Sequence, residues 1–118
     1  MVYSVAFIST EQEHDLILSF AITEEASEDI LSLTLLRTPQ YEHSLLPDER
    51  GISVSWEKDE NLDELLKAVE RSKNLIKLNT NKREITLDLS RVKQPQLNNM
   101  RKVLQKMNFD KVIRLKGF

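Results

Sequence analysis

The chain has 118 residues, the usual size of one domain and enough to bury a core without disulfides or a structural metal. Because it contains no cysteine, disulfide frameworks, thiolate metal sites and cysteine nucleophiles are excluded. No stretch is long and apolar enough to cross a bilayer, and the N-terminus lacks the pattern of a signal peptide. We therefore expect a cytoplasmic single domain, residues 1–118, that is soluble and does not bind membranes.

Charge is distributed unevenly along the chain. Residues 1–60 carry 3 basic and 13 acidic side chains, whereas residues 61–118 carry 14 basic and 6 acidic ones. Two interpretations stay open. The halves neutralise each other on the surface of one fold, or they form separate acidic and basic binding faces.

Three segments within residues 1–37 alternate apolar and polar side chains, which is the period of a half-buried strand. Short polar links join them, and such links favour antiparallel pairing of neighbouring strands. The sequence therefore predicts a three-strand meander whose inward side chains are Tyr3, Val5 and Phe7, then Leu16, Leu18, Phe20 and Ile22, then Leu31, Leu33 and Leu35.

Residues 38–51 (TPQYEHSLLPDERG) predict a long irregular loop. They contain Pro39 and Pro47, and each proline removes a backbone donor and biases the preceding residue away from helix. A loop of this length in a compact domain is more often functional than a plain connector.

The next segment predicts a strand and then a helix. Ile52, Val54 and Trp56 alternate with polar residues. Asn61 is suited to cap a helix, with Glu64 three residues later as its capping-box partner. The apolar stripe of this predicted helix consists of Leu62, Leu65, Leu66 and Val69, at the spacing of one helical face.

The C-terminal part predicts a hairpin, a second helix and a final strand. Leu75 to Leu78 and Ile85 to Leu89 read as strands joined by a polar turn, and the last strand covers Lys111 to Lys116. The second helix begins near Pro95 and carries the apolar stripe Leu97, Met100, Val103, Leu104 and Met107. Residues 52–118 thus predict the order β-α-β-β-α-β, the ferredoxin-like arrangement.

Together these segments predict an α+β fold with a mostly antiparallel sheet and two helices packed on one face. Seven predicted strands allow one strongly curled sheet or two sheets, and the sequence does not choose between them.

The sequence contains no catalytic or cofactor motif. Its two glycines cannot form a phosphate-cradling loop, and nucleophile-elbow, zinc-protease and calcium-loop signatures are missing. We therefore expect neither enzymatic activity nor a cofactor. The weak candidates for a metal site are His14 and His43, each flanked by acidic residues, which leaves a metal-dependent hydrolase as a second alternative.

These observations favour a small non-catalytic interaction protein, of the inhibitor, immunity or adaptor type. It would present an acidic sheet segment and loop 38–51 to a protein partner that is itself basic. The candidate partner-binding residues are Tyr41, Leu45, Leu46, Asp48, Glu49 and Arg50. A homodimer formed through an exposed sheet edge is also open.

The first alternative function is nucleic-acid binding through the basic C-terminal half. Its candidate residues are Lys82, Arg83, Arg101, Lys102 and Lys106. Few aromatic residues accompany these cations, so this alternative depends on electrostatics alone.

Overall fold

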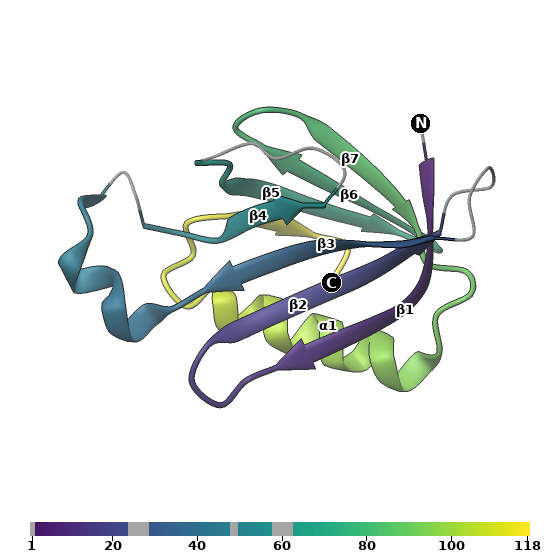
Figure 1. Ribbon diagram of the computed structural model, residues 1–118, viewed down its shortest axis with the longest axis horizontal. Coiled ribbons are helices and arrows are strands. Elements are labelled where there is room, and N and C mark those ends of the chain that lie inside the picture. The colour runs from purple at the N-terminus through teal and green to yellow at the C-terminus, as the bar shows by residue number, and fades with distance from the viewer. Residues whose placement is uncertain (1, 24–28, 48–49, 58–62) are drawn as a thin grey trace.

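The computed structural model describes residues 2–23, 29–47, 50–57 and 63–118, and this part of the chain has an α+β fold. It consists of a mixed eight-stranded sheet, one α-helix and one short 3-10 helix (Figure 1). The strands are β1 (Val2–Glu11), β2 (Leu16–Thr23), β3 (Ile30–Arg37), β4 (Ser53–Trp56), β5 (Leu66–Ser72), β6 (Leu75–Thr80), β7 (Glu84–Asp88) and β8 (Arg114–Lys116). The helices are η1 (Pro39–Ser44) and α1 (Gln94–Met107). The predicted α+β class is therefore confirmed.

The strands lie in the order β4-β3-β2-β1-β7-β6-β5-β8. Strands β1 to β4 pair antiparallel with their chain neighbours, and so do β5 to β7. Two parallel pairings, β1 with β7 and β5 with β8, complete the sheet. The apolar alternation decides which side is buried: on β2, Leu18, Phe20 and Ile22 have no exposed surface.

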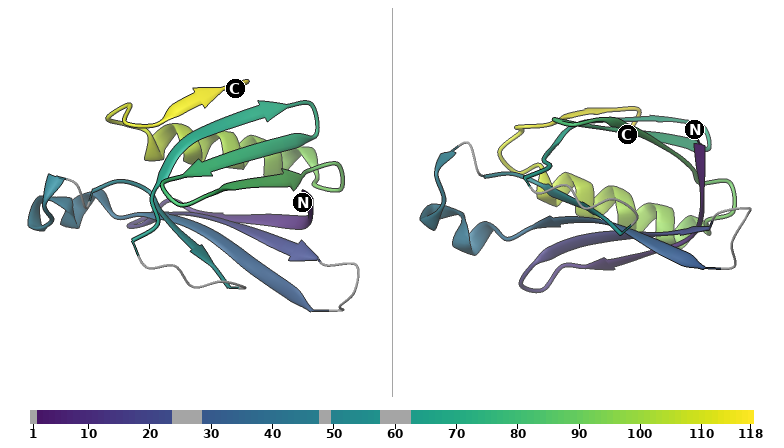
Figure 2. Two further views of the ribbon diagram at one scale, coloured as in Figure 1. Left: turned by 90° about the horizontal axis from the view of Figure 1, so that it is seen from above. Right: turned by 45° about the horizontal axis from the view of Figure 1, so that its top comes forward.

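The sheet curls until its β4 edge meets the beginning of β5. Ser53 and Leu65 form an isolated antiparallel bridge. Next to it, the Val54 N–H donates to the Glu64 carbonyl at 2.9 Å, and the Leu66 N–H donates to the Ile52 carbonyl at 2.8 Å. Figure 2 shows β1 to β3 and β5 to β7 on opposite sides of α1. The chain therefore has one strongly curled sheet around a shared core.

Helix α1 confirms the second predicted helix. Its apolar stripe is buried in full, from Leu97 to Met107. The helix also contacts β1, whose pairing with β7 extends only over its first residues, up to Ser4. Further along, the Ile8 N–H donates to the Gln96 side chain of α1 at 2.9 Å. A strand edge that lacks a neighbouring strand is thus satisfied by the helix.

The first predicted helix is wrong. Its proposed cap Asn61 and stripe residue Leu62 lie outside the described residues, but 66–72 form strand β5. The pairing with β6 contains a β-bulge: Leu66 pairs with Thr80 and Ala68 with Asn79, so Lys67 is an extra residue. The bulge therefore turns both Leu66 and Val69 inward, and this three-residue spacing imitates the face of a helix.

This correction also changes the predicted order of elements. From β4 onward the chain runs through four strands before α1 and β8, so the β-α-β-β-α-β order of a ferredoxin-like arrangement is not observed. Within the described ranges α1 is the one α-helix, and two helices on one face are not present. Phe7, predicted to point inward, is 46% exposed because β1 has its own bulge between Val5 and Phe7.

Candidate interaction surface

The buried side chain of Arg37 organises one end of the molecule. Its Nε and Nη2 donate to the two carboxylate oxygens of Glu42 at 2.7 and 2.9 Å. Nη1 and Nη2 donate to the carboxylate of Asp110 at 2.9 and 2.7 Å, and Nη1 also donates to the Met107 carbonyl at 2.7 Å. All five N–H groups of the guanidinium are therefore used. The ring of Phe109 lies against the guanidinium, 4.2 Å from its central carbon.

The two carboxylates make burial of this cation tolerable. Arg37 is 2% exposed, and burial alone would lower its pKa, but hydrogen bonds and charge from Glu42 and Asp110 raise it above its ordinary value. In return, hydrogen bonds from Arg37 lower the pKa of Asp110, although burial opposes this. Arg37 and Asp110 thus stabilise each other in their charged forms.

Through this network Arg37 fastens two separate segments to the end of β3. Glu42 belongs to η1, whereas Met107 and Asp110 belong to the end of α1 and the turn that follows it. The two segments are distant in sequence but are held on the same buried side chain. We therefore expect both to keep a fixed position relative to the sheet.

These two segments carry five of the large apolar side chains that remain exposed in the described residues. The exposed fractions are 62% for Tyr41, 41% for Leu45, 63% for Leu46, 57% for Phe109 and 60% for Val112. We call this set, Tyr41, Leu45, Leu46, Phe109 and Val112, the apolar end. Exposed apolar side chains on rigidly held segments are typical of binding sites rather than of ordinary surface.

A shallow concavity of about 260 Å³ lies between η1 and the sheet. Its lining includes Tyr41 and Leu45 on one side and Leu36, Ser53 and Leu65 on the other. The end of β3 and the junction of β4 with β5 therefore form the floor beneath η1. A side chain of a partner that binds the apolar end could insert there.

The predicted loop 38–51 is more ordered than its composition indicated. Residues Pro39–Ser44 form the 3-10 helix η1, which begins with a proline, a residue preset for a helical first turn. After it, Arg50 donates from Nε and Nη2 to the Leu45 carbonyl at 3.2 and 3.0 Å. Of the six predicted partner-binding residues, Tyr41, Leu45 and Leu46 are exposed here and Arg50 braces Leu45. Asp48 and Glu49 lie outside the described residues.

The acidic side chains that the structure describes in the N-terminal half do not form a sheet face. Glu42 is buried, and the other described acidic residues of this half lie near strand ends and in turns. They are Glu11, Glu13, Asp15, Asp29 and Glu57. The outer face of β1 to β4 instead carries a row of hydroxyl side chains, since Ser9, Ser19, Thr34 and Ser55 are consecutive partners across four strands. Among the described residues, the acidic charge beside β1 to β4 is therefore concentrated at the strand ends.

The basic residues predicted for nucleic-acid binding are not brought together. Arg101, Lys102 and Lys106 lie on the exposed face of α1, where the Lys106 ammonium donates to the Gln12 side chain at 2.6 Å. Lys82 and Arg83 lie in and beside the β6–β7 turn, on the far side of the strands from α1 (Figure 1). Arg83 also forms an ion pair with buried Glu64, with 2.8 Å between Nη2 and Oε1.

The two histidines lie in different connections. His14 is exposed in the turn between β1 and β2, and His43 is exposed on η1. In the described ranges no group of three or more His, Cys, Asp or Glu side chains is placed to hold a metal ion.

The edges available for strand pairing with a second copy are short. The β4 edge already contacts the beginning of β5 through the Ser53–Leu65 bridge. The opposite edge is β8, which has three residues and exposes Arg114 and Lys116. Short edges with basic side chains discourage pairing between sheets.

Sequence reasoning missed Arg37, Phe109, Asp110 and Val112 as contributors to this surface. A signal for Arg37 was present, because it continues the inward alternation of Leu33 and Leu35 and so falls on the buried side of β3. A buried arginine requires partners, which here are Glu42 and Asp110. The partner 73 residues away carries no local signal.

No family model, curated protein or solved structure matches this chain. In the described part of the chain no helix is both long and apolar enough to cross a membrane.

Proposed function

We propose that this protein is a non-catalytic interaction protein that binds a protein partner through the apolar end. The observation that supports this proposal is the attachment of both exposed apolar segments to one saturated, buried arginine. Because the segments are held in place before binding, little conformational entropy is lost when a partner binds. An inhibitor, immunity protein or adaptor would use such a surface.

The chemistry of the surface indicates how a partner would bind. Tyr41 and Phe109 supply aromatic side chains, the type that contributes most to binding energy in interfaces. Asp48 and Glu49 follow the apolar residues in the sequence, and acidic side chains in a binding segment would speed association with a basic partner. We therefore expect the partner to insert an apolar side chain beside η1 and to surround it with basic residues.

A double substitution at the apolar end tests this proposal. In Tyr41→Ala/Leu46→Ala, two side chains that are 62% and 63% exposed are truncated without opening the core. We expect the partner that wild-type protein captures from a lysate of the native host to be lost, or to bind the purified variant at least about 10-fold more weakly.

The matched control is Ile30→Ala. Ile30 is also exposed, at 52%, but it begins β3, whereas the apolar end is fastened to the last residue of that strand. The control should keep the partner with wild-type affinity, and both variants should melt close to the wild type because surface truncations change stability little. If the double variant captures the same partner as Ile30→Ala, the proposal is wrong.

A further inference from the structure

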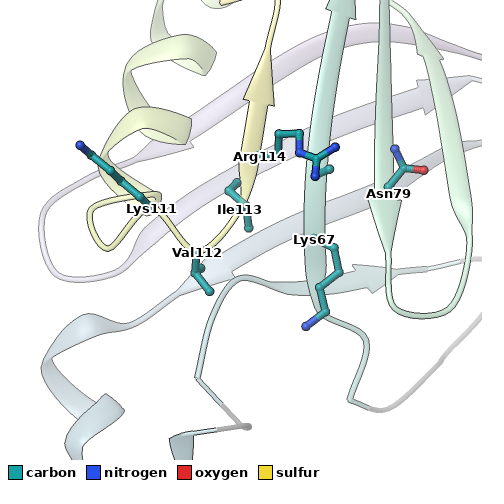
Figure 3. A pocket seen from close by; sticks show the side chains of 7 residues that line it. Lys67, Asn79, Lys111, Val112, Ile113 and Arg114 are labelled. Atoms are coloured by element: carbon teal, nitrogen blue, oxygen red, sulfur yellow. The ribbon is translucent and has the colours of Figure 1, made fainter.

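A second concavity lies between β5, β6 and the segment that leads into β8 (Figure 3). Its volume is about 550 Å³, a size that suits a small organic ligand. Three basic side chains, Lys67, Lys111 and Arg114, contribute to its lining, together with the amide of Asn79 and the apolar side chain of Val112. We call it the basic pocket.

Among the described residues, none that lines the basic pocket carries a carboxylate. The acidic residues nearest in the chain are already engaged, since Asp110 pairs with Arg37 and Glu70 lies 3.8 Å from Lys116. Within the described residues no ion pair reaches any of the three cations. Their mutual repulsion would therefore be relieved by a bound anion.

The pairing of β5 with β8 brings the backbone positions of two of these residues close together. Arg114 on β8 is the parallel partner of Ala68, and Lys67, the extra residue of the bulge, immediately precedes Ala68. Figure 3 shows the Arg114 side chain reaching from β8 to β5, whereas the Lys67 side chain projects from the beginning of β5 with its ammonium turned away from the guanidinium. Lys67 is exposed, so rotation of its side chain can bring the ammonium to an anion held by Arg114. The Lys111 ammonium points away from these two groups in that view, so Lys111 contributes charge at the rim.

We propose that the basic pocket binds a phosphate monoester. The planar guanidinium of Arg114 can donate two parallel hydrogen bonds to phosphate oxygens, and the Lys67 ammonium can neutralise the second negative charge. The Asn79 amide offers a further donor from β6. Val112 and Ala68 provide the apolar contact that the carbon skeleton of an ester requires.

This inference does not depend on the proposed function. The apolar end and the basic pocket share only Val112, and the tests use other residues. Each proposal can therefore fail without the other.

Calorimetric titration at fixed ionic strength tests the basic pocket with three probes, which are inorganic phosphate, adenosine monophosphate and glucose 6-phosphate. We expect saturable binding of one ligand per chain, with at least one ester binding more tightly than inorganic phosphate. The stronger ester identifies the nucleotide or the sugar as the source of the phosphate. Acetate at the same ionic strength should bind at least 10-fold more weakly, because it carries one charge.

Substitutions locate the binding site. Lys67→Gln and Arg114→Gln should each weaken binding by about 10-fold or more. Both side chains are exposed, so both variants should melt within a few degrees of the wild type. Lys116→Gln is the matched control, because Lys116 lies on the same short strand and outside the lining, and it should bind like the wild type.

Three results would overturn the proposal. The first is heat that does not saturate for any of the three probes. The second is equal weakening in Lys116→Gln, which would show that net charge alone attracts the anion. The third is binding of single-stranded DNA without binding of any monoester.

Discussion

At the residue scale, the side chain with the greatest structural consequence is Arg37. It is the C-terminal residue of β3, it is 2% exposed, and it holds η1 and the segment after α1 through five hydrogen bonds. A buried ion pair adds little net stability compared with an apolar pair of the same shape. Removal of one partner nevertheless lowers the free energy of unfolding strongly, because it leaves a buried charge without its counter-ion. Arg37 therefore acts mainly as a specifying residue that decides where the apolar end lies.

Arg37→Met tests this role. The substitution removes every donor and leaves the Glu42 carboxylate, 11% exposed, without its cation. We expect the free energy of unfolding, measured with urea, to fall by about 3–5 kcal/mol. Lys77→Met removes one member of an exposed pair with Glu84 at 3.8 Å and should change the free energy by less than about 0.5 kcal/mol. A similar, small loss in both variants would contradict the assigned role of Arg37.

At the element scale, β5 shows how a tertiary environment overrides a local pattern. The segment that leads into β5 is held by a side chain of the β6–β7 turn. Asn81 accepts from the Leu65 N–H at 2.9 Å and donates to the Asp63 carbonyl at 3.0 Å. The strand is then paired on both sides, with β6 and β8. A lone helix could not supply these contacts, and helix propensity differences are only tenths of a kcal/mol per residue.

A glycine substitution distinguishes the strand from the predicted helix. Lys73 is the first residue of the two-residue turn between β5 and β6 and has a φ of 51°, a region in which glycine is preferred. Lys73→Gly should therefore raise the free energy of unfolding by about 0.5–1 kcal/mol. If Lys73 occupied an interior position of a helix, the same substitution would lower the free energy of unfolding by about 1 kcal/mol.

Ser72→Gly is the control, because Ser72 pairs with Leu75 in extended backbone. It should lower the free energy of unfolding by about 0.5–1 kcal/mol. Destabilisation by Lys73→Gly, measured in the same urea titrations, would show that the turn geometry is wrong.

At the scale of the whole molecule, the fold depends on the closure of the curled sheet where β4 meets β5. Glu64 lies at that junction, 2% exposed, and accepts from Arg83 at 2.8 and 3.0 Å and from the Thr80 hydroxyl at 2.7 Å. Burial would raise the pKa of this carboxyl, yet the hydrogen bonds from Arg83 and Thr80 hold it below its ordinary value of 4.5. The ionised form of Glu64 therefore stabilises the folded chain at this junction.

The sign of the pH dependence follows from these pKa values. The pKa of Glu64 is lower in the folded state than in the unfolded state, and so is that of Asp110. Their stabilising contribution is complete above the unfolded values and is lost as pH falls through the folded ones. The free energy of unfolding should therefore be steady from pH 7 to about 5 and should fall below about pH 4.5.

Glu64→Gln measures how much Glu64 contributes to the fall in the free energy of unfolding at acid pH. The amide keeps the shape but loses the charge, so stability at pH 7 should fall by about 1–3 kcal/mol. The further loss between pH 5 and pH 3 should be smaller than in the wild type, because one titrating group is gone. An unchanged acid slope in the variant would show that Glu64 does not couple ionisation to closure.

The candidate surface could be predicted only in part. Proline content and length drew attention to residues 38–51, where Tyr41, Leu45 and Leu46 are exposed. Phe109 and Val112 could not be joined to them from sequence, because the connection runs through one buried side chain to residues about 70 positions away. The basic pocket escaped prediction for a similar reason, since β5 and β8 are far apart in the chain and meet in a parallel pairing.

The sequence by itself determined the segments whose periodicity is decided locally. The alternation of β2 and β3 and the apolar stripe of α1 were readable because a side chain that faces one common core repeats at the period of its own element. Only the tertiary structure decided the identity of β5, since the bulge at Lys67 gives a strand the spacing of a helix. The closure at Glu64 and the anchoring of the apolar end by Arg37 were also decided there, because long-range pairing is a property of the folded chain and not of any one segment.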